Sequence, residues 1–353
     1  MTVAFVLGGG GVRGAVEVGM LRALLEAGLM PGLIVGTSIG AINGAAVAHN
    51  PTMSVIDDLE QAWGSPTASA VYGDSWWRQM QRLAQSRTHL NDPGPLRELL
   101  ASIIGADTTF ADLAVPFAAC AASIERASEV WFDSGPVIDA VLASASVPAA
   151  LPPTLIDGEH YVDGALNKTL HASVALDEGV SLLICVNPLV PYDASSSAQR
   201  GGLTKPKLNQ GGLPLVLGQT FRAIIHSRMK VGMEKYARQY PDASIMLFEP
   251  DPEDADMFFA NIFSYRQRRR LCALAFERTR RNLLARADVL SPALARHGIT
   301  LRMDRLQDPA RSENDALTDP RPLHAQARGD VRRTARDLRH TLVHLERWLA
   351  GAH

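Results

Sequence analysis

The fold is decided by the stretch Val3-Ala-Phe-Val-Leu-Gly-Gly-Gly-Gly-Val-Arg-Gly14, which joins a short apolar run to a cluster of glycines. Such a run is typical of a buried parallel strand that feeds a tight turn. Apolar residues then recur at helical spacing over Ala15–Ala27, and a second short apolar run follows at Leu33–Val35. Small apolar residues fill Ile39–Ala48. This alternation predicts strand–helix–strand–helix, the opening of a parallel α/β sheet.

Further strands and helices are predicted along the rest of the chain. Residues 50–110 have a mainly helical and irregular pattern. A hairpin turning at Asp157-Gly158 is expected over residues 154–163. The other expected elements are strands at 117–123, 129–132, 181–186 and 245–248, and helices at about 136–144, 215–238 and 266–286.

Composition divides the chain near residue 195. Ser195–Gly212 is rich in Ser, Gly, Lys and Asn, which is typical of a flexible loop at the edge of a domain over residues 1–195. Residues 196–304 are expected to form a mostly helical extension packed on that core. Residues 305–329 have the composition of a polar linker, and residues 330–353 carry the apolar spacing of an amphipathic helix.

Overall composition bounds the class of protein. The chain has 353 residues, of which 46% are hydrophobic and 20% charged, as in a globular protein with a sizeable core. A net charge of -2 gives no support for a nucleic-acid partner. Cys120, Cys185 and Cys272 are far apart and lack metal-binding spacing, so we expect reduced thiols and a cytoplasmic protein. The uncharged stretch Leu29–Ala48 is interrupted by Pro and Gly, and we expect no membrane span there.

Basic charge is concentrated toward the C-terminus. Residues 260–353 hold 19 Arg and no Lys, against 10 Asp and Glu. A solvated helical region is the interpretation that we favour, and contact with an anionic lipid surface is the alternative. The aromatic stretch Met257–Phe263 either packs into the body or adds to such an interfacial patch. The sequence therefore leaves open a peripheral contact with a membrane or lipid droplet.

A pentapeptide of the nucleophile-elbow type follows the second predicted strand, namely Gly36-Thr-Ser38-Ile-Gly40. In the G-x-S-x-G motif the serine occupies a sharp turn between a strand and a helix. The flanking glycines are needed because side chains there would clash with the neighbouring strand and helix. The following helix directs its N-terminal dipole at the serine. This context predicts Ser38 as a nucleophile, with Gly36 and Gly40 as the elbow glycines.

The glycine loop over residues 8–14 allows three interpretations. Gly9, Gly11 and Gly14 have the spacing of a dinucleotide fingerprint, but the second strand ends without the acidic residue that would bind the ribose. A P-loop is excluded because Gly14 is followed by Ala-Val instead of Lys-Ser or Lys-Thr. An oxyanion hole fits best, since amides at the end of the first strand lie beside the elbow that follows the second.

A serine nucleophile needs a proton acceptor. In an α/β-hydrolase several strands precede the serine, and an acidic residue and then a histidine follow it in the chain. Here only one strand is predicted before the strand that leads into the serine. His171 and His226 are the candidates by position, although a lone histidine is more often a packed or surface residue. Asp163 ends the predicted hairpin before Gly164-Ala165, so its carboxylate projects from a turn at the sheet edge. A simple Asp-Gly turn is the alternative for Asp163.

Taken in order, three motifs of this chain resemble the patatin-like phospholipases: Gly9-Gly-Gly-Val-Arg-Gly14, Gly36-Thr-Ser-Ile-Gly40 and Asp163-Gly-Ala165. Ala143-Ser-Ala-Ser-Val-Pro148 adds to the resemblance, which covers about residues 1–190. The resemblance implies a three-layer α/β/α sandwich with a mainly parallel central sheet. It also implies that residues 1–195 are the catalytic domain, to which the mostly helical C-terminal extension is added.

The resemblance further implies a Ser–Asp dyad that replaces the triad, with Ser38 as the nucleophile and Asp163 as the proton acceptor. The oxyanion hole falls on the glycine loop, at Gly9, Gly10, Gly11, Arg13 and Gly14, and the aspartate motif includes Gly164 and Ala165. No metal and no cofactor is expected. Two positions depart from the family pattern, since Gly164 is followed by Ala where many members have Gly, and Asn167-Lys-Thr-Leu170 lacks a frequent proline.

The activity implied by the resemblance is hydrolysis of acyl esters of lipids, of the phospholipase A or lysophospholipase type. The expected partner is then a lipid or fatty-acyl ester substrate. Acyl transfer or general carboxylesterase chemistry at the same site is the first alternative. A non-catalytic lipid-binding module of the same fold is the second.

Overall fold

The computed structural model describes residues 2–10, 13–64, 79, 82, 85–193, 212–252, 257 and 265–309. The expected helix over 330–353, most of the linker before it and most of the aromatic stretch 257–263 lie outside these residues.

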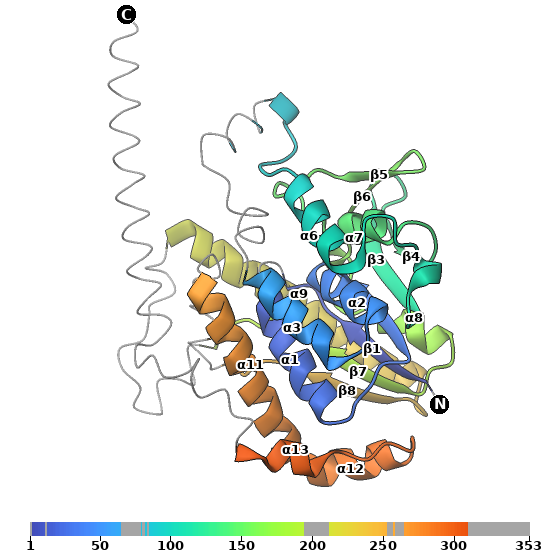
Figure 1. The fold of residues 1–353 in the computed structure, drawn as a ribbon. Coiled ribbons are helices and arrows are strands. Elements are labelled where there is room, and N and C mark those ends of the chain that lie inside the picture. The colour runs from blue at the N-terminus through green and yellow to red at the C-terminus, as the bar shows by residue number, and fades with distance from the viewer. Residues whose placement is uncertain are drawn as a thin grey trace, which may run out of the picture.

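Within the described residues, a central sheet of eight strands carries the architecture (Figure 1). Followed from one hydrogen-bonded neighbour to the next, the strands run β5-β6-β3-β2-β1-β7-β8. Strand β3 has a third partner, β4, which lies along the edge opposite β2 and β6. The strands are β1 (Val3–Leu7), β2 (Leu33–Thr37), β3 (Phe117–Ser123), β4 (Ser128–Phe132), β5 (Thr154–Ile156), β6 (Glu159–Asp163), β7 (Leu182–Val186) and β8 (Ser244–Phe248).

Five of these strands are parallel and form the centre of the sheet, because β3-β2-β1-β7-β8 pair in one direction. Strands β4, β5 and β6 add antiparallel pairs at one side. The prediction of a mainly parallel α/β sheet is therefore confirmed. Strand β8 comes from beyond residue 195 and continues the same sheet as β7.

Helices cover both faces of the sheet and make three layers (Figure 1). Alternate strand residues divide between two apolar cores, with Phe5 in the first and Val6 in the second. The first core is covered by α1 (Gly14–Glu26), α2 (Ile39–His49), α3 (Met53–Trp63), α6 (Gly94–Ile104), α7 (Val137–Ala145), α11 (Tyr265–Ala285), α12 (Ala287–Ala295) and α13 (Met303–Gln307). The second is covered by α8 (Ala172–Asp177) and α9 (Gly212–Gln239).

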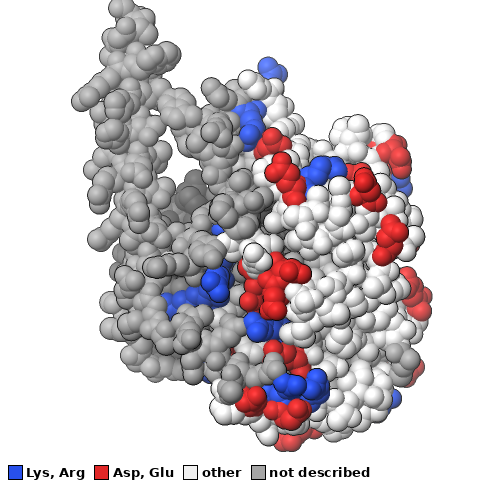
Figure 2. Space-filling view, in the orientation of Figure 1, with Lys and Arg blue, Asp and Glu red and all other residues white. Residues whose placement is uncertain are grey.

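The arginine-rich helix α11 packs along α1, which explains part of the unusual composition of the C-terminal region. Its apolar residues Leu271 and Phe276 are buried in the first core. A Cβ at Gly19 of α1 would overlap the backbone of Cys272, so glycine permits this close approach. Arg22 on α1 pairs with Glu60 on α3 at 3.0 Å, and Figure 2 shows acidic and basic side chains intermixed over this face. None of the described helices combines the length and apolarity needed to cross a membrane.

Candidate active site

Strand pairing brings the two predicted dyad residues together across 125 positions of sequence. Strand β2 pairs with the first half of β3, where Thr37 lies opposite Cys120. Strand β6 runs antiparallel beside the second half, where Asp163 lies opposite Ala121. Strand β4 pairs along the opposite edge of β3. Strands β2 and β6 therefore lie one after the other along the same edge of β3, and the end of β2 meets the end of β6. The residue after β2 is Ser38, and its Oγ donates to Oδ2 of Asp163 at 2.5 Å.

Ser38 adopts a strained backbone conformation, with φ 57° and ψ -120°. A non-glycine residue rarely has positive φ, and such strain persists only where surrounding bonds impose it. Here the Ser38 N–H donates to Oγ of Ser144 at 2.8 Å, and that hydroxyl donates to the Cys120 carbonyl at 2.6 Å. Ser144 therefore ties the elbow to β3. It stands in the segment 143–148 that supported the family resemblance, but residue patterns alone gave it no role.

The elbow glycines lie where side chains would not fit. A Cβ at Gly36 would come within 2.6 Å of the Ala41 Cα, and one at Gly40 would overlap the backbone of Leu7 in β1. Glycine at both positions lets α2 begin directly behind Ser38 while it packs against β1. A Cβ at Gly164 would likewise overlap the Cys120 carbonyl, which explains a glycine after Asp163.

Asp163 is held by three hydrogen bonds in a buried position. Besides the Ser38 hydroxyl, its Oδ1 accepts from the Ala165 N–H at 2.8 Å. Its own N–H donates to the Ser146 carbonyl at 3.0 Å. Burial raises the pKa of Asp163 from 3.8 to about 6, and the bonds from Ser38 and Ala165 lower it in part. An aspartate so perturbed is a stronger base than an exposed one and is still ionised at neutral pH.

The glycine loop crosses the end of the sheet beside this pair. The Gly8 N–H donates to the Val186 carbonyl at 2.9 Å, and the Gly9 N–H to the Thr169 carbonyl at 3.4 Å. A Cβ on Gly9 would lie 2.6 Å from that of Ala165 and 3.5 Å from that of Ser38. The loop thus passes directly over both dyad residues. The Gly10 N–H makes no hydrogen bond to the described residues, and Gly11 lies outside them.

Arg13 and Gly14 lead from the loop into α1. Arg13 is the residue before the helix and is 4% exposed. Burial and the nearby charge of Arg222 lower the pKa of its guanidinium to about 9. A Cβ at Gly14 would overlap the indole of Trp63, so α1 and α3 meet closely at this end.

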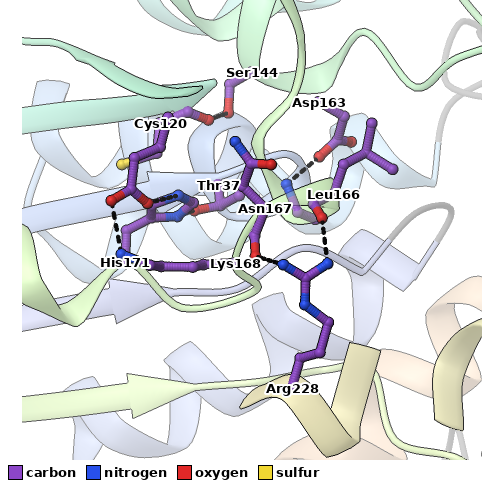
Figure 3. Close-up of polar contacts among 11 residues, drawn as sticks. Thr37, Cys120, Ser144, Asp163, Leu166, Asn167, Lys168, His171 and Arg228 are labelled. Atoms are coloured by element: carbon purple, nitrogen blue, oxygen red, sulfur yellow. Dashed lines mark hydrogen bonds and ion pairs between the residues drawn. The ribbon is translucent and has the colours of Figure 1, made fainter. Parts of the chain in front are cut away.

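Neither candidate histidine serves Ser38. His171 lies behind the elbow, where its Nδ1 is 2.9 Å from Oγ1 of Thr37 and its Nε2 is 3.6 Å from Glu129 (Figure 3). Burial lowers the pKa of His171 to about 4, so it is neutral at pH 7. His226 on α9 pairs with Glu249 at 3.3 Å. Among the described residues, no group of His, Cys, Asp or Glu is arranged to hold a metal ion.

Arg228 adds a contact that the sequence did not suggest. Its guanidinium extends from α9 and donates to the carbonyls of Leu166 and Asn167 at 3.0 and 2.9 Å (Figure 3). These carbonyls belong to the turn that follows Asp163. The helical extension is therefore bonded to the turn that follows Asp163.

A buried polar network beneath the loop was also missed. Glu17 is fully buried on α1 and its Oε2 accepts from Nδ2 of Asn43 at 2.7 Å. Asn43 Oδ1 in turn accepts from the Trp63 indole N–H at 2.8 Å. An acidic residue between Val16 and Val18, in the otherwise apolar first half of α1, was the available signal. Burial raises the pKa of Glu17 to about 8, so this carboxyl is protonated at neutral pH.

Glu17→Gln is expected to remove a pH-dependent loss of stability. The folded pKa of Glu17 lies above its ordinary value of 4.5, so its contribution is full below pH 4.5 and is lost as pH rises through about 8. Between pH 4.5 and about 8 the wild type loses on the order of 3–5 kcal/mol of stability, which the neutral amide of the variant retains. Urea unfolding of both proteins between pH 5 and 9 measures the effect. Parallel curves for the two proteins would contradict it.

Comparison with known proteins adds a family match to this geometry. Residues 5–176 match the family described as Patatin-like phospholipase. Patatin-like phospholipase domain-containing protein 7 of Rattus norvegicus is 31% identical over 187 residues, which are 52% of this chain and 13% of that protein. Lysophospholipase nte1 of Aspergillus terreus is 31% identical over 186 residues, covering 53% of this chain and 12% of that protein.

Neuropathy target esterase sws of Drosophila melanogaster is 26% identical over 188 residues, covering 53% of this chain and 13% of that protein. The similarity thus spans only a small part of each of these curated relatives.

Proposed function

Residues 5–176 belong to the patatin-like phospholipase family, and we propose that the chain hydrolyses acyl esters of lipids through Ser38 and Asp163. The observation that carries the proposal is the 2.5 Å hydrogen bond from the Ser38 hydroxyl to the buried Asp163 carboxylate. A nucleophile and a base within this distance meet the geometric requirement for covalent catalysis.

In the proposed reaction, Ser38 Oγ attacks the carbonyl carbon of the ester while its proton passes to Asp163. The tetrahedral intermediate expels the alcohol, which takes that proton, and an acyl-serine remains. Water then attacks the acyl-serine and gives a proton to Asp163. The second tetrahedral intermediate expels Ser38 Oγ, which takes that proton from Asp163, so the fatty acid is released and the Ser38 hydroxyl and the Asp163 carboxylate are restored. The pKa of about 6 for Asp163 supports this assignment, because the carboxylate is both ionised and basic at pH 7.

We assign the oxyanion site to the loop amides at Gly10 and Gly11, with support from the N-terminus of α2. The Gly9 amide bonds to Thr169, so its contribution is to place the loop over the dyad. Arg13 and Gly14 support the loop in this place, because Arg13 is buried and its N–H donates to the Gly10 carbonyl at 3.3 Å, while Gly14 packs against Trp63. Preorganised amides of this kind stabilise an oxyanion strongly, and losing one donor typically costs about 2.7–4 kcal/mol.

The substrate class that we favour is a phospholipid or lysophospholipid. One similar protein is named a lysophospholipase and others are named for a phospholipase domain. A general carboxylesterase and an acyltransferase would use the same dyad, and they differ only in the ester and in the acceptor of the acyl group.

Isotope-labelled product analysis tests the proposal. The purified chain is incubated with lysophosphatidylcholine or phosphatidylcholine in water enriched in 18-O, and products are analysed by mass spectrometry. Hydrolysis is expected to release fatty acid that carries one labelled oxygen. Acyl groups recovered on a second alcohol would favour the acyltransferase. Absence of turnover, together with absence of Ser38 labelling by a fluorophosphonate, would contradict the enzyme and favour a lipid-binding module.

A further inference from the structure

The solvent-facing side of α9 carries several large apolar side chains, which is unusual for a surface helix. Leu217, Phe221, Ile224 and Val231 are 57%, 49%, 54% and 65% exposed. Their spacings of four, three and seven residues place them on one side of the helix. Ile225, Met229 and Tyr236 lie on an adjoining side of the helix and are buried, where Met229 and Tyr236 contact the second core. The apolar stripe is therefore additional to the packing face.

Basic residues continue the same stripe. Arg228, Lys235 and Arg238 follow the apolar residues at the same three- and four-residue spacing, and all three are exposed. One acidic residue, Glu234, lies beside them and pairs with Arg238 at 3.7 Å. We call the face formed by Leu217, Phe221, Ile224, Arg228, Val231, Lys235 and Arg238 the α9 outer face.

We propose that the α9 outer face binds an anionic phospholipid surface and holds it beside the dyad. An apolar stripe with basic residues is the pattern of a helix that lies in a membrane interface, where the apolar side chains insert and the cations meet phosphate groups. This inference rests on the proposed lipid substrate. Charge favours an anionic lipid as the binding partner of this basic face. The other candidate, residues 330–353 of the same chain, has five Arg against three acidic residues and would be repelled because it is itself basic.

The position of the face supports a link to the site. Arg228 belongs to the stripe and bonds to the carbonyls of Leu166 and Asn167 in the turn after Asp163 (Figure 3). A lipid surface on the α9 outer face would thus be one arginine side chain from the dyad loop. This arrangement places the lipid source beside the turn that follows Asp163.

Vesicle flotation with the full-length Ser38→Ala protein tests the surface without turnover. The vesicles contain phosphatidylcholine with or without phosphatidylglycerol. The Leu217→Asp/Phe221→Asp variant is expected to bind the anionic vesicles at least tenfold more weakly, because two inserting side chains are lost. Leu155→Asp/Val289→Asp is the matched control, since these residues are 61% and 74% exposed on other elements. Equal binding by wild type and the α9 variant, or no binding by either, overturns the proposal.

Charge reversal tests the anionic component. Lys235→Glu/Arg238→Glu is expected to reduce binding to phosphatidylglycerol vesicles about tenfold, with a smaller effect on pure phosphatidylcholine. Equal loss on both vesicle types would remove the argument from charge and overturn the anionic assignment. Circular dichroism melting of each variant excludes loss of binding by unfolding.

Thiol accessibility distinguishes a lipid from other occupants. The native cysteines are buried, so a maleimide reports on Phe221→Cys alone. Rapid labelling that anionic vesicles slow at least fivefold supports the proposal. Slow labelling without vesicles overturns it, and the measured mass then shows whether a second copy or the chain's own segment covers the face. If the wild type hydrolyses a soluble ester but does not bind vesicles, the lipid-binding role of the α9 outer face is wrong and the proposed function stands. If it binds vesicles but does not hydrolyse the ester, the proposed function alone is wrong.

Discussion

Ser38→Ala is expected to lower the rate of ester hydrolysis by at least about 10³-fold, because the acyl-enzyme cannot form without the hydroxyl. The fold should survive, since the elbow is held by the Ser38 N–H and not by its side chain. Release of p-nitrophenol from a short-chain ester measures the rate. This substrate dissolves as single molecules, so the result does not depend on a lipid surface.

Two controls make the Ser38 result specific. A fluorophosphonate should label the wild type at Ser38, while Ser38→Ala should remain unlabelled and show an unchanged melting temperature. Ser144→Ala is a useful companion, because its hydroxyl supports the elbow without reaching the substrate and should reduce the rate less. Turnover by Ser38→Ala within tenfold of wild type would assign the nucleophile elsewhere.

Asp163→Asn is expected to cause a loss of similar size and to remove the acidic limb of the pH profile. The carboxylate must be ionised to accept a proton, so kcat/KM of the wild type should rise with pH through about 6 and level above it. The amide of the variant cannot take up that proton, and its residual rate should lack this transition. Rates between pH 4.5 and 8 on the soluble ester measure both profiles.

Stability provides the control for Asp163→Asn. The folded pKa of Asp163 is raised, so its contribution to stability is full below 3.8 and is lost as pH rises through about 6. At pH 8 the buried charge costs on the order of 2–3 kcal/mol, which the neutral amide avoids. The inactive variant should therefore melt no lower than wild type at pH 8. An active variant, or a wild-type profile without a transition near pH 6, would contradict the role of Asp163.

Local sequence was sufficient for much of the fold. The apolar runs at Val3–Leu7 and Leu33–Val35 correspond to β1 and β2, and the glycines between elements correspond to close approaches. These signals are local, because strand length, helix periodicity and the lack of a Cβ act over a few residues. The hairpin that ends at Asp163 was predicted for the same reason.

Other features depended on contacts between distant segments. No local pattern showed that Ser144 would accept the Ser38 N–H, that Asn43 would contact Glu17, or that Arg228 would reach the turn after Asp163. The pKa values of Asp163 and Glu17 are raised by burial, and burial is known only once the layers have packed.

The parallel α/β core, the serine turn between β2 and α2, and the acidic end of the hairpin could be predicted from the residues, because each follows from short-range geometry. That β2 and β6 share one edge of β3, so that the Ser38 hydroxyl and the Asp163 carboxylate meet, depends on long-range packing. The same is true of α9, which packs with an apolar and basic face turned outward. Strand order and helix orientation result from packing of the whole chain, which local pattern does not specify.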